Sequence, residues 1–161
     1  MKKYLIVILT LLATISSNAQ ILKPVTWSYA AKKISKTDAI IYLKVKIEDS
    51  WHIYASNQKG VGPVKTSFNF MPSRDYALIG KLIEPKPITK YEDTFEMDIS
   101  YFEKSVVFQQ KIKLKEVLKK NQGDTITRPA QVVVKGSVEF MACTNKECLP
   151  AETINFSIPI K

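Results

Sequence analysis

The chain has 161 residues, with 24 lysines and arginines against 15 acidic residues, so its formal net charge is +9. The lysines are spread along the whole chain, and no arginine-rich or glycine–aromatic motif of nucleic-acid-binding proteins is present. Composition and charge therefore argue against nucleic acid as a partner, and indicate solubility with a mild preference for acidic protein surfaces.

The first nineteen residues have the pattern of a secretory signal peptide. Lys2 and Lys3 form a positive start, residues 4–15 an apolar run, and Ser17 to Ala19 a small-residue cleavage site. The apolar run is shorter than the roughly 20 residues that a spanning helix needs, so cleavage is favoured over an uncleaved anchor. No other segment could span a membrane. We expect export to the periplasm, a signal peptide at residues 1–19 and one domain at residues 20–161.

Alternation of apolar and polar side chains, typical of β-strands, dominates that domain. The clearest strand is Ala39 to Ile47, whose apolar face holds Ala39, Ile41, Leu43, Val45 and Ile47. Further strands are predicted at residues 25–34, 51–54, 66–70, 76–83, 95–101, 106–114, 132–140 and 154–160. Without a long amphipathic helix, these short strands predict an all-β fold, an antiparallel two-sheet sandwich.

Turn signals separate the strands. Residues 56–64 contain two glycines and a proline and are predicted to form a loop. Pro85 and Pro87 predict a stiff, exposed loop that continues from Ile88 to Asp93. Glu103-Lys104 is predicted to be a hairpin turn, and the polar residues 116–127 a connection with room for one helical turn.

The two cysteines, Cys143 and Cys148, lie at a predicted corner between two strands, and in an exported chain they are expected to form a disulfide. A loop this short stabilises the fold by only about 2 kcal/mol, against ~4 kcal/mol for a bond that spans fifty or more residues. Pro150 cannot extend a strand ladder and would keep the bond accessible. A structural staple and a redox switch both remain open on spacing alone.

Three other kinds of site can be considered. His52, the single histidine, could pair with a cysteine in catalysis, but no motif supports this, and a packing role beside Trp51 is favoured. A copper(I) site could use both cysteines with Met141 and His52, although four ligands would have to converge. A pair of glycosidase carboxylates has no signature, because the acidic residues near the middle of the chain have the pattern of turns and solvated faces; these are Glu92, Asp93, Glu96 and Asp98.

The segment S-V-E-F-M-A-C-T-N-K-E-C-L-P-A at residues 137–151 resembles the active-site corner of the amino-terminal periplasmic domain of the DsbD thiol:disulfide interchange protein family. Further similarity lies in W-H-I-Y at residues 51–54, G-K-L-I-E-P-K-P at 80–87 and Y-E-D-T-F-E-M-D at 91–98. The likeness covers nearly all of the chain after the signal peptide, and the two-cysteine corner is its specific part.

This resemblance implies an immunoglobulin-like sandwich with activity of the protein-disulfide reductase type, or an electron shuttle alone. Its redox group would be the cysteine pair, with no other cofactor and no metal. By the family pattern, Cys148 forms the mixed disulfide with partners and Cys143 resolves it. A cap loop that shields the pair matches in position a run of seven residues: Pro87, Ile88, Thr89, Lys90, Tyr91, Glu92 and Asp93.

The implied partners are thioredoxin-fold periplasmic proteins, such as a disulfide isomerase or a reductase of cytochrome c maturation, and a membrane hub that supplies electrons. The cysteine spacing is one residue shorter than in the best-known member, and Ala151 replaces a second proline. The chain ends after this domain, so the hub is expected on a separate chain. The alternatives are a non-enzymatic exported binding protein with a structural disulfide and a copper carrier.

Overall fold

The computed structural model describes residues 22–58, 60, 62–93, 95–115, 119–120, 126–127 and 131–161. The expected signal peptide lies outside these residues, as do most of residues 116–127, the polar connection with room for one helical turn. No helix long and apolar enough to cross a bilayer occurs in the described part of the chain.

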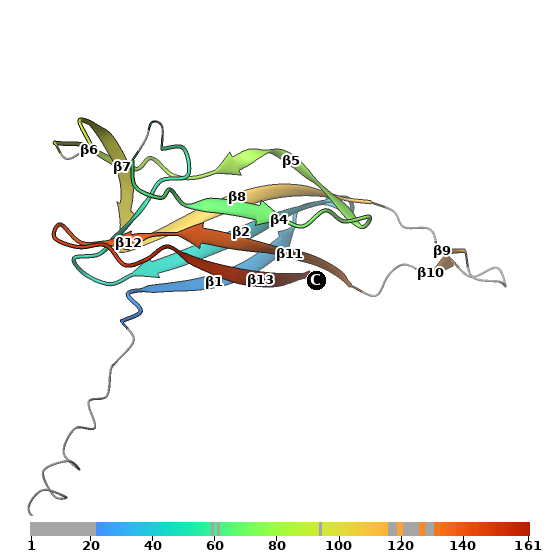
Figure 1. Cartoon of the computed structure of the whole chain (residues 1–161). Coiled ribbons are helices and arrows are strands. Elements are labelled where there is room, and N and C mark those ends of the chain that lie inside the picture. The colour runs from blue at the N-terminus through green and yellow to red at the C-terminus, as the bar shows by residue number, and fades with distance from the viewer. Residues whose placement is uncertain are drawn as a thin grey trace, which may run out of the picture.

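Every regular element of the described residues is a β-strand (Figure 1). The first seven strands are β1 (Val25–Lys33), β2 (Asp38–Ile47), β3 (His52–Tyr54), β4 (Ser67–Phe70), β5 (Tyr76–Ile83), β6 (Ile88–Glu92) and β7 (Met97–Glu103). The others are β8 (Ser105–Leu114), β9 (Lys119–Lys120), β10 (Ile126–Thr127), β11 (Val132–Phe140), β12 (Ala142–Cys143) and β13 (Glu152–Ile160). The strand predictions are therefore largely confirmed, to within a few residues at their ends.

Two antiparallel sheets form the body of the molecule, as predicted. One has the strand order β1-β2-β8-β5 and the other the order β13-β11-β4. A third sheet, β12-β3-β7-β6, lies at one end of this sandwich, at the left in Figure 1, and β9 pairs with β10 in a short ribbon. The third sheet carries the cysteine corner, and the sandwich supports this sheet at one end.

The core lies between the two large sheets and follows directly from the alternation in the sequence. The apolar face of β2, from Ala39 to Ile47, is buried throughout. Phe108 of β8 is 0% exposed, and its ring lies 4.9 Å from that of Phe68 and 6.1 Å from that of Trp27, centre to centre. Burying one side chain of this size stabilises the fold by about 1.5–3 kcal/mol. Burial of the whole apolar face of β2 therefore strongly favours the sandwich.

The prediction of a hairpin turn at Glu103-Lys104 is wrong. β7 pairs with β3 and β6, whereas β8 pairs with β2 and β5, so the two strands belong to different sheets. Lys104 has a positive φ of 61°, which bends the chain sharply, and its carbonyl accepts a hydrogen bond from the N–H of Ile47 at 2.7 Å. The β2–β8 ladder thus ends at a corner and resumes as the β3–β7 ladder of the third sheet.

The segment from Ile88 to Asp93 was expected to continue a loop, and this too is corrected. Residues 88–92 form β6, which pairs along its length with β7 and makes a hairpin of the two. Pro85 and Pro87 end β5 and precede β6, so neither has to donate to a ladder. The hairpin replaces a stiff loop beside the cysteine corner.

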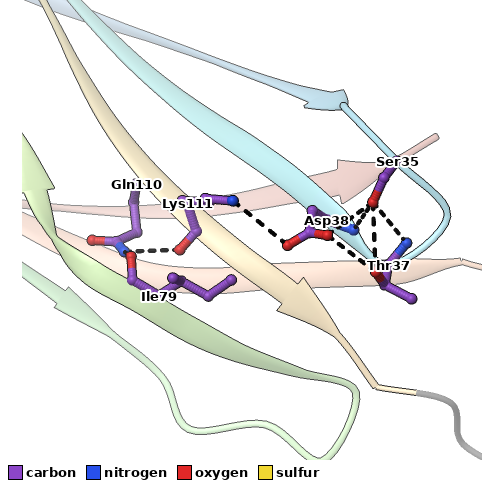
Figure 2. A network of polar contacts seen from close by, with 6 residues as sticks. All are labelled: Ser35, Thr37, Asp38, Ile79, Gln110 and Lys111. Atoms are coloured by element: carbon purple, nitrogen blue, oxygen red, sulfur yellow. Dashed lines mark hydrogen bonds and ion pairs between the residues drawn. The ribbon is translucent and has the colours of Figure 1, made fainter.

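Polar side-chain contacts stabilise two irregular parts of the first sheet, the bulge in β5 and the turn between β1 and β2 (Figure 2). β5 carries a bulge between Ile79 and Ile83, with Gly80 at a φ of 67°, and the buried Gln110 side chain donates a hydrogen bond to the Ile79 carbonyl at 3.1 Å. In the β1–β2 turn, hydrogen bonds from the side chains of Ser35 and Thr37 lower the pKa of Asp38. These contacts keep the sheet continuous far from the cysteines.

Candidate functional site: the disulfide groove

Cys143 and Cys148 are bonded to each other, with an S–S distance of 2.03 Å and a Cα–Cα distance of 4.0 Å. They lie in the connection between β11 and β13, whose ladder ends at the pair Phe140 and Glu152. After β11 the chain leaves its sheet, and β12 pairs instead with β3. The expected strand-to-strand corner is therefore present, and it joins the second sheet to the third.

Thr144 closes the turn between the two cysteines. Its Oγ1 accepts hydrogen bonds from the backbone N–H groups of Lys146 and Glu147, both at 3.1 Å, and its own N–H donates to the Glu147 carbonyl at 2.8 Å. Threonine favours such turns because its hydroxyl can replace a backbone acceptor. The bond from the Leu149 N–H to the Ala142 carbonyl, 2.9 Å, then aligns the two cysteines as antiparallel bridge partners.

The two cysteines differ sharply in exposure. Cys148 is exposed, whereas Cys143 is only 1% exposed. Val138, Phe140 and Ala142, which alternate along the chain before the turn, are buried in the main core. Cys143, on the opposite face, is buried in a second, smaller apolar cluster, whose other members are Tyr54, Ile99, Met97, Tyr101 and Met141.

A hollow of about 320 Å³, named here the disulfide groove, opens beside Cys148. Three walls surround it: strand β3, the β6–β7 hairpin and the cysteine turn. The lining side chains are His52, Tyr54, Lys90, Glu92, Phe95, Ile99, Tyr101, Thr144, Asn145, Lys146, Glu147 and Cys148. A sulfur atom at the edge of a groove of this kind can be reached by the thiolate of another protein.

Three rings form the floor of the groove. The centre of the His52 ring lies 5.3 Å from that of Tyr54 and 5.0 Å from that of Tyr101, and His52 Nε2 lies 3.4 Å from Tyr54 Oη. Burial lowers the pKa of His52, and the carboxylates of Glu103 and Glu92 oppose that shift. Burial also raises the pKa values of both tyrosines, so the floor is uncharged at neutral pH.

Of the seven residues expected to form a cap loop, only two line the groove. Lys90 and Glu92 line it, whereas Thr89 faces Ser100, with 3.1 Å between their hydroxyl oxygens. Ile88 and Tyr91 are largely exposed and do not line the groove. Pro87 precedes the strand and Asp93 begins the turn that follows it.

Sequence reasoning missed Phe95 and the three rings as groove residues. Phe95 was assigned to a strand, but it lies in the β6–β7 turn and reaches the groove. His52 was assigned a packing role beside Trp51. The period of two in W-H-I-Y was the available signal, because it places His52 and Tyr54 on one face and the buried Trp51 and Ile53 on the other.

Among the described residues, no group of three or more His, Cys, Asp or Glu side chains could hold a metal ion. Of the four ligands considered for copper, the two cysteine sulfurs are bonded to each other. Of the four acidic residues considered for glycoside hydrolysis, Asp93, Glu96 and Asp98 are exposed, as expected of turns and solvated faces, and Glu92 lines the groove.

Comparisons with known proteins agree with this geometry. The family described as "Thiol:disulfide interchange protein DsbD, N-terminal" matches residues 18–159. The amino-terminal domain of DsbD from Neisseria meningitidis, solved in the reduced form, is 15% identical with a TM-score of 0.50, over 86% of this chain and 89% of that one. A search of curated proteins returned no match.

The amino-terminal periplasmic domain of ScsB from Proteus mirabilis is 22% identical with a TM-score of 0.53. The likeness covers 86% of this chain but only 47% of that one, so this chain spans about half of the ScsB domain. At such identities these neighbours show the fold alone. They confirm the predicted all-β, immunoglobulin-like sandwich.

Proposed function

This chain belongs to the family of DsbD amino-terminal domains, and we propose that it is a thiol:disulfide interchange module that passes reducing equivalents between thioredoxin-fold proteins. The observation that carries the proposal is the asymmetry of the bonded pair. Cys148 is exposed beside a groove, and Cys143 is buried behind it. One sulfur is thus available to a partner, while the other can be reached only from within.

The exchange has two steps. In the reduced protein, the thiolate of Cys148 attacks a sulfur of the partner's disulfide, so that a mixed disulfide forms and one partner sulfur leaves as a thiolate. Cys143 then attacks Cys148 Sγ, the internal disulfide forms, and the second partner thiolate is released. The partner is reduced by two electrons and the Cys143–Cys148 pair is oxidised by two.

The electrons return by the reverse route. A thiolate of a thioredoxin-like donor, supplied by a membrane hub, attacks the exposed Cys148 Sγ and displaces Cys143. We propose that this electron transfer takes place in the periplasm, after removal of residues 1–19. The neighbour from ScsB, which is named a periplasmic domain, supports that placement. Thioredoxin-fold proteins that act in disulfide isomerisation or in cytochrome c maturation would be suitable electron acceptors.

The β6–β7 hairpin, including residues 87–93, takes the role of the cap in this proposal. Lys90 and Glu92 border the groove from one side, and Phe95 borders it from the turn. A partner whose thiol approaches Cys148 through the groove would contact this wall. Docking of a partner would then displace the hairpin.

Trapping a mixed disulfide tests the proposal. A Cys143→Ser variant keeps the exposed thiol but cannot resolve, so it should accumulate a covalent complex with thioredoxin-fold periplasmic proteins of the host. Cys148→Ser, its matched control, retains only the buried thiol and should trap none. Equal trapping by both variants, or by neither, contradicts the assigned roles.

The reduction potential separates this proposal from a structural disulfide. Structural bonds lie below about −300 mV, so a shuttle should equilibrate at a higher potential in glutathione or dithiothreitol buffers. In cells, alkylation should find the pair reduced when the thiol-reducing pathway is intact and oxidised when it is deleted. A pair that stays oxidised in both strains would contradict the exchange role.

A further inference from the structure

Four side chains lie in one row across the third sheet and its neighbouring turn. Cys148 is the bridge partner of Cys143, Cys143 is the register partner of His52, and His52 is the register partner of Glu103. Directly opposed residues of antiparallel strands point to the same face, with Cβ atoms about 5 Å apart. The row therefore orders an exposed sulfur, a buried sulfur, an imidazole and a carboxylate, side by side.

The buried sulfur faces a chemical difficulty that the exposed one does not. Only the thiolate is a competent nucleophile, and burial among apolar side chains disfavours it. Cys143 is enclosed by Tyr54, Ile99 and the other members of the small cluster, and water has little access to it. Resolution of a mixed disulfide therefore requires a nearby group that accepts the Cys143 proton.

We propose that His52 is a catalytic residue of the exchange reaction, serving as the general base for Cys143. This inference rests on the function proposed above and extends it to the resolving step. His52 is the one histidine of the chain. It is also the side chain that β3 places directly across from Cys143, on the face that lines the groove.

The proton of the Cys143 thiol passes to the His52 imidazole while Cys143 Sγ attacks Cys148 Sγ, and the bond from Cys148 Sγ to the partner's sulfur breaks with its electron pair on the partner. The imidazolium then gives its proton to water or to the leaving thiolate. In the reverse direction, Cys143 leaves as a thiolate and the imidazolium protonates it.

The surroundings of His52 suit a base that works at neutral pH. Burial lowers the pKa of His52, so the ring is in its neutral, proton-accepting form there. Glu103, the next side chain in the row, opposes that shift and stabilises the imidazolium once it forms. The other titratable or charged groups around the same groove are Tyr54, Lys90, Glu92, Tyr101, Lys146 and Glu147.

A small disulfide reagent separates the two steps without any protein partner. Reduced protein mixed with one equivalent of dithiodipyridine should release thiopyridone twice, first when Cys148 attacks the reagent and again when Cys143 resolves the adduct. Stopped-flow absorbance follows both phases. Cys143→Ser identifies the first phase, because it should show that phase alone.

His52→Gln should slow the second release at least tenfold at neutral pH and change the first release by less than threefold. In the wild type, the second phase should slow as the pH falls below the pKa of His52, and this acid limb should be absent from the variant. Glu103→Gln should shift the acid limb to lower pH, because the carboxylate holds the His52 pKa up. A wild-type second phase in His52→Gln, or equal slowing of both phases, would overturn the proposal.

Chemical rescue guards against a purely structural effect of the substitution. His52→Ala leaves room for a free heterocycle, so added imidazole should accelerate the second release, whereas pyrazole, of the same shape but far less basic, should not. Equal effects of the two would contradict a base. Failure of Cys143→Ser to trap any thioredoxin-fold protein would refute the proposed function and leave the reagent experiment unaffected, so the two failures are distinguishable.

Discussion

The core of the sandwich and the disulfide groove are both built from β-strands, but they differ in how far their side chains are exposed to water. In the core, the apolar side chains of Phe108, Leu43 and Ile41 are completely buried. In the groove, His52 is only partly buried, and Cys148 is exposed. The core holds side chains that water should never reach, whereas the groove holds groups that must exchange protons or electrons.

Two strands take part in both regions. On β3, Ile53 faces the core while His52 faces the groove, and on β7 Phe102 and Tyr101 are divided in the same way. The third sheet is thus fixed from behind by apolar packing and leaves its other face free for chemistry. Stability and reactivity are therefore assigned to opposite faces of the same strands, and substitutions should separate the two.

The largest effect is expected from Cys148→Ser. A hydroxyl cannot replace the thiolate, so reduction of a thioredoxin-fold disulfide should fall by at least about 10³-fold. The melting temperature should stay close to that of a Cys143→Ser/Cys148→Ser double variant, because neither forms the bond. Residual activity within tenfold of the wild type would show that the exposed sulfur is not the reactive one.

The same substitution made in each region should sharpen the contrast. Phe108→Ala removes a ring that is 0% exposed and should destabilise the fold by about 3–5 kcal/mol in urea unfolding. Phe95→Ala, in the β6–β7 turn where the ring is 40% exposed, should cost about 1 kcal/mol or less. Equal costs would mean that the hairpin is packed as firmly as the core.

Removal of the disulfide should cost little stability. The bond closes a sequence separation of only 5 residues, so the Cys143→Ala/Cys148→Ala variant should lose about 2 kcal/mol. Urea unfolding of this variant against the oxidised wild type measures the difference. A loss of ~4 kcal/mol or more would favour a structural staple over a working bond.

The smallest effect is expected in the pH dependence of folding stability. Because burial lowers the pKa of His52 in the folded state, the unfolded chain binds its proton first as the pH falls below 6.5. His52 therefore contributes a loss of stability that begins near that pH and is complete below its folded pKa. Thermal unfolding of His52→Phe across this range should show a shallower decline than the wild type, and an unchanged decline would assign the sensitivity to other groups.

Local patterns in the sequence were sufficient for most strands. The alternation from Ala39 to Ile47 predicted β2 and its buried face, and Pro85 and Pro87 marked the end of β5. These local patterns were insufficient wherever the chain passed from one sheet to another. Glu103-Lys104 has the composition of a hairpin turn, and only the positive φ of Lys104 and the pairing of β8 with β2 make it a corner.

The sequence by itself determined an all-β sandwich and a cysteine pair in a turn, because the alternation of side chains and the spacing of two thiols are local properties of the chain. Only the tertiary structure decided which sulfur is buried and which side chains surround it. Cys143 and His52 are 91 residues apart in sequence and meet only through the register of β12 on β3. Register depends on which face of each strand is buried and on the geometry of the connecting turns, so it is settled only when strands distant in sequence pack together.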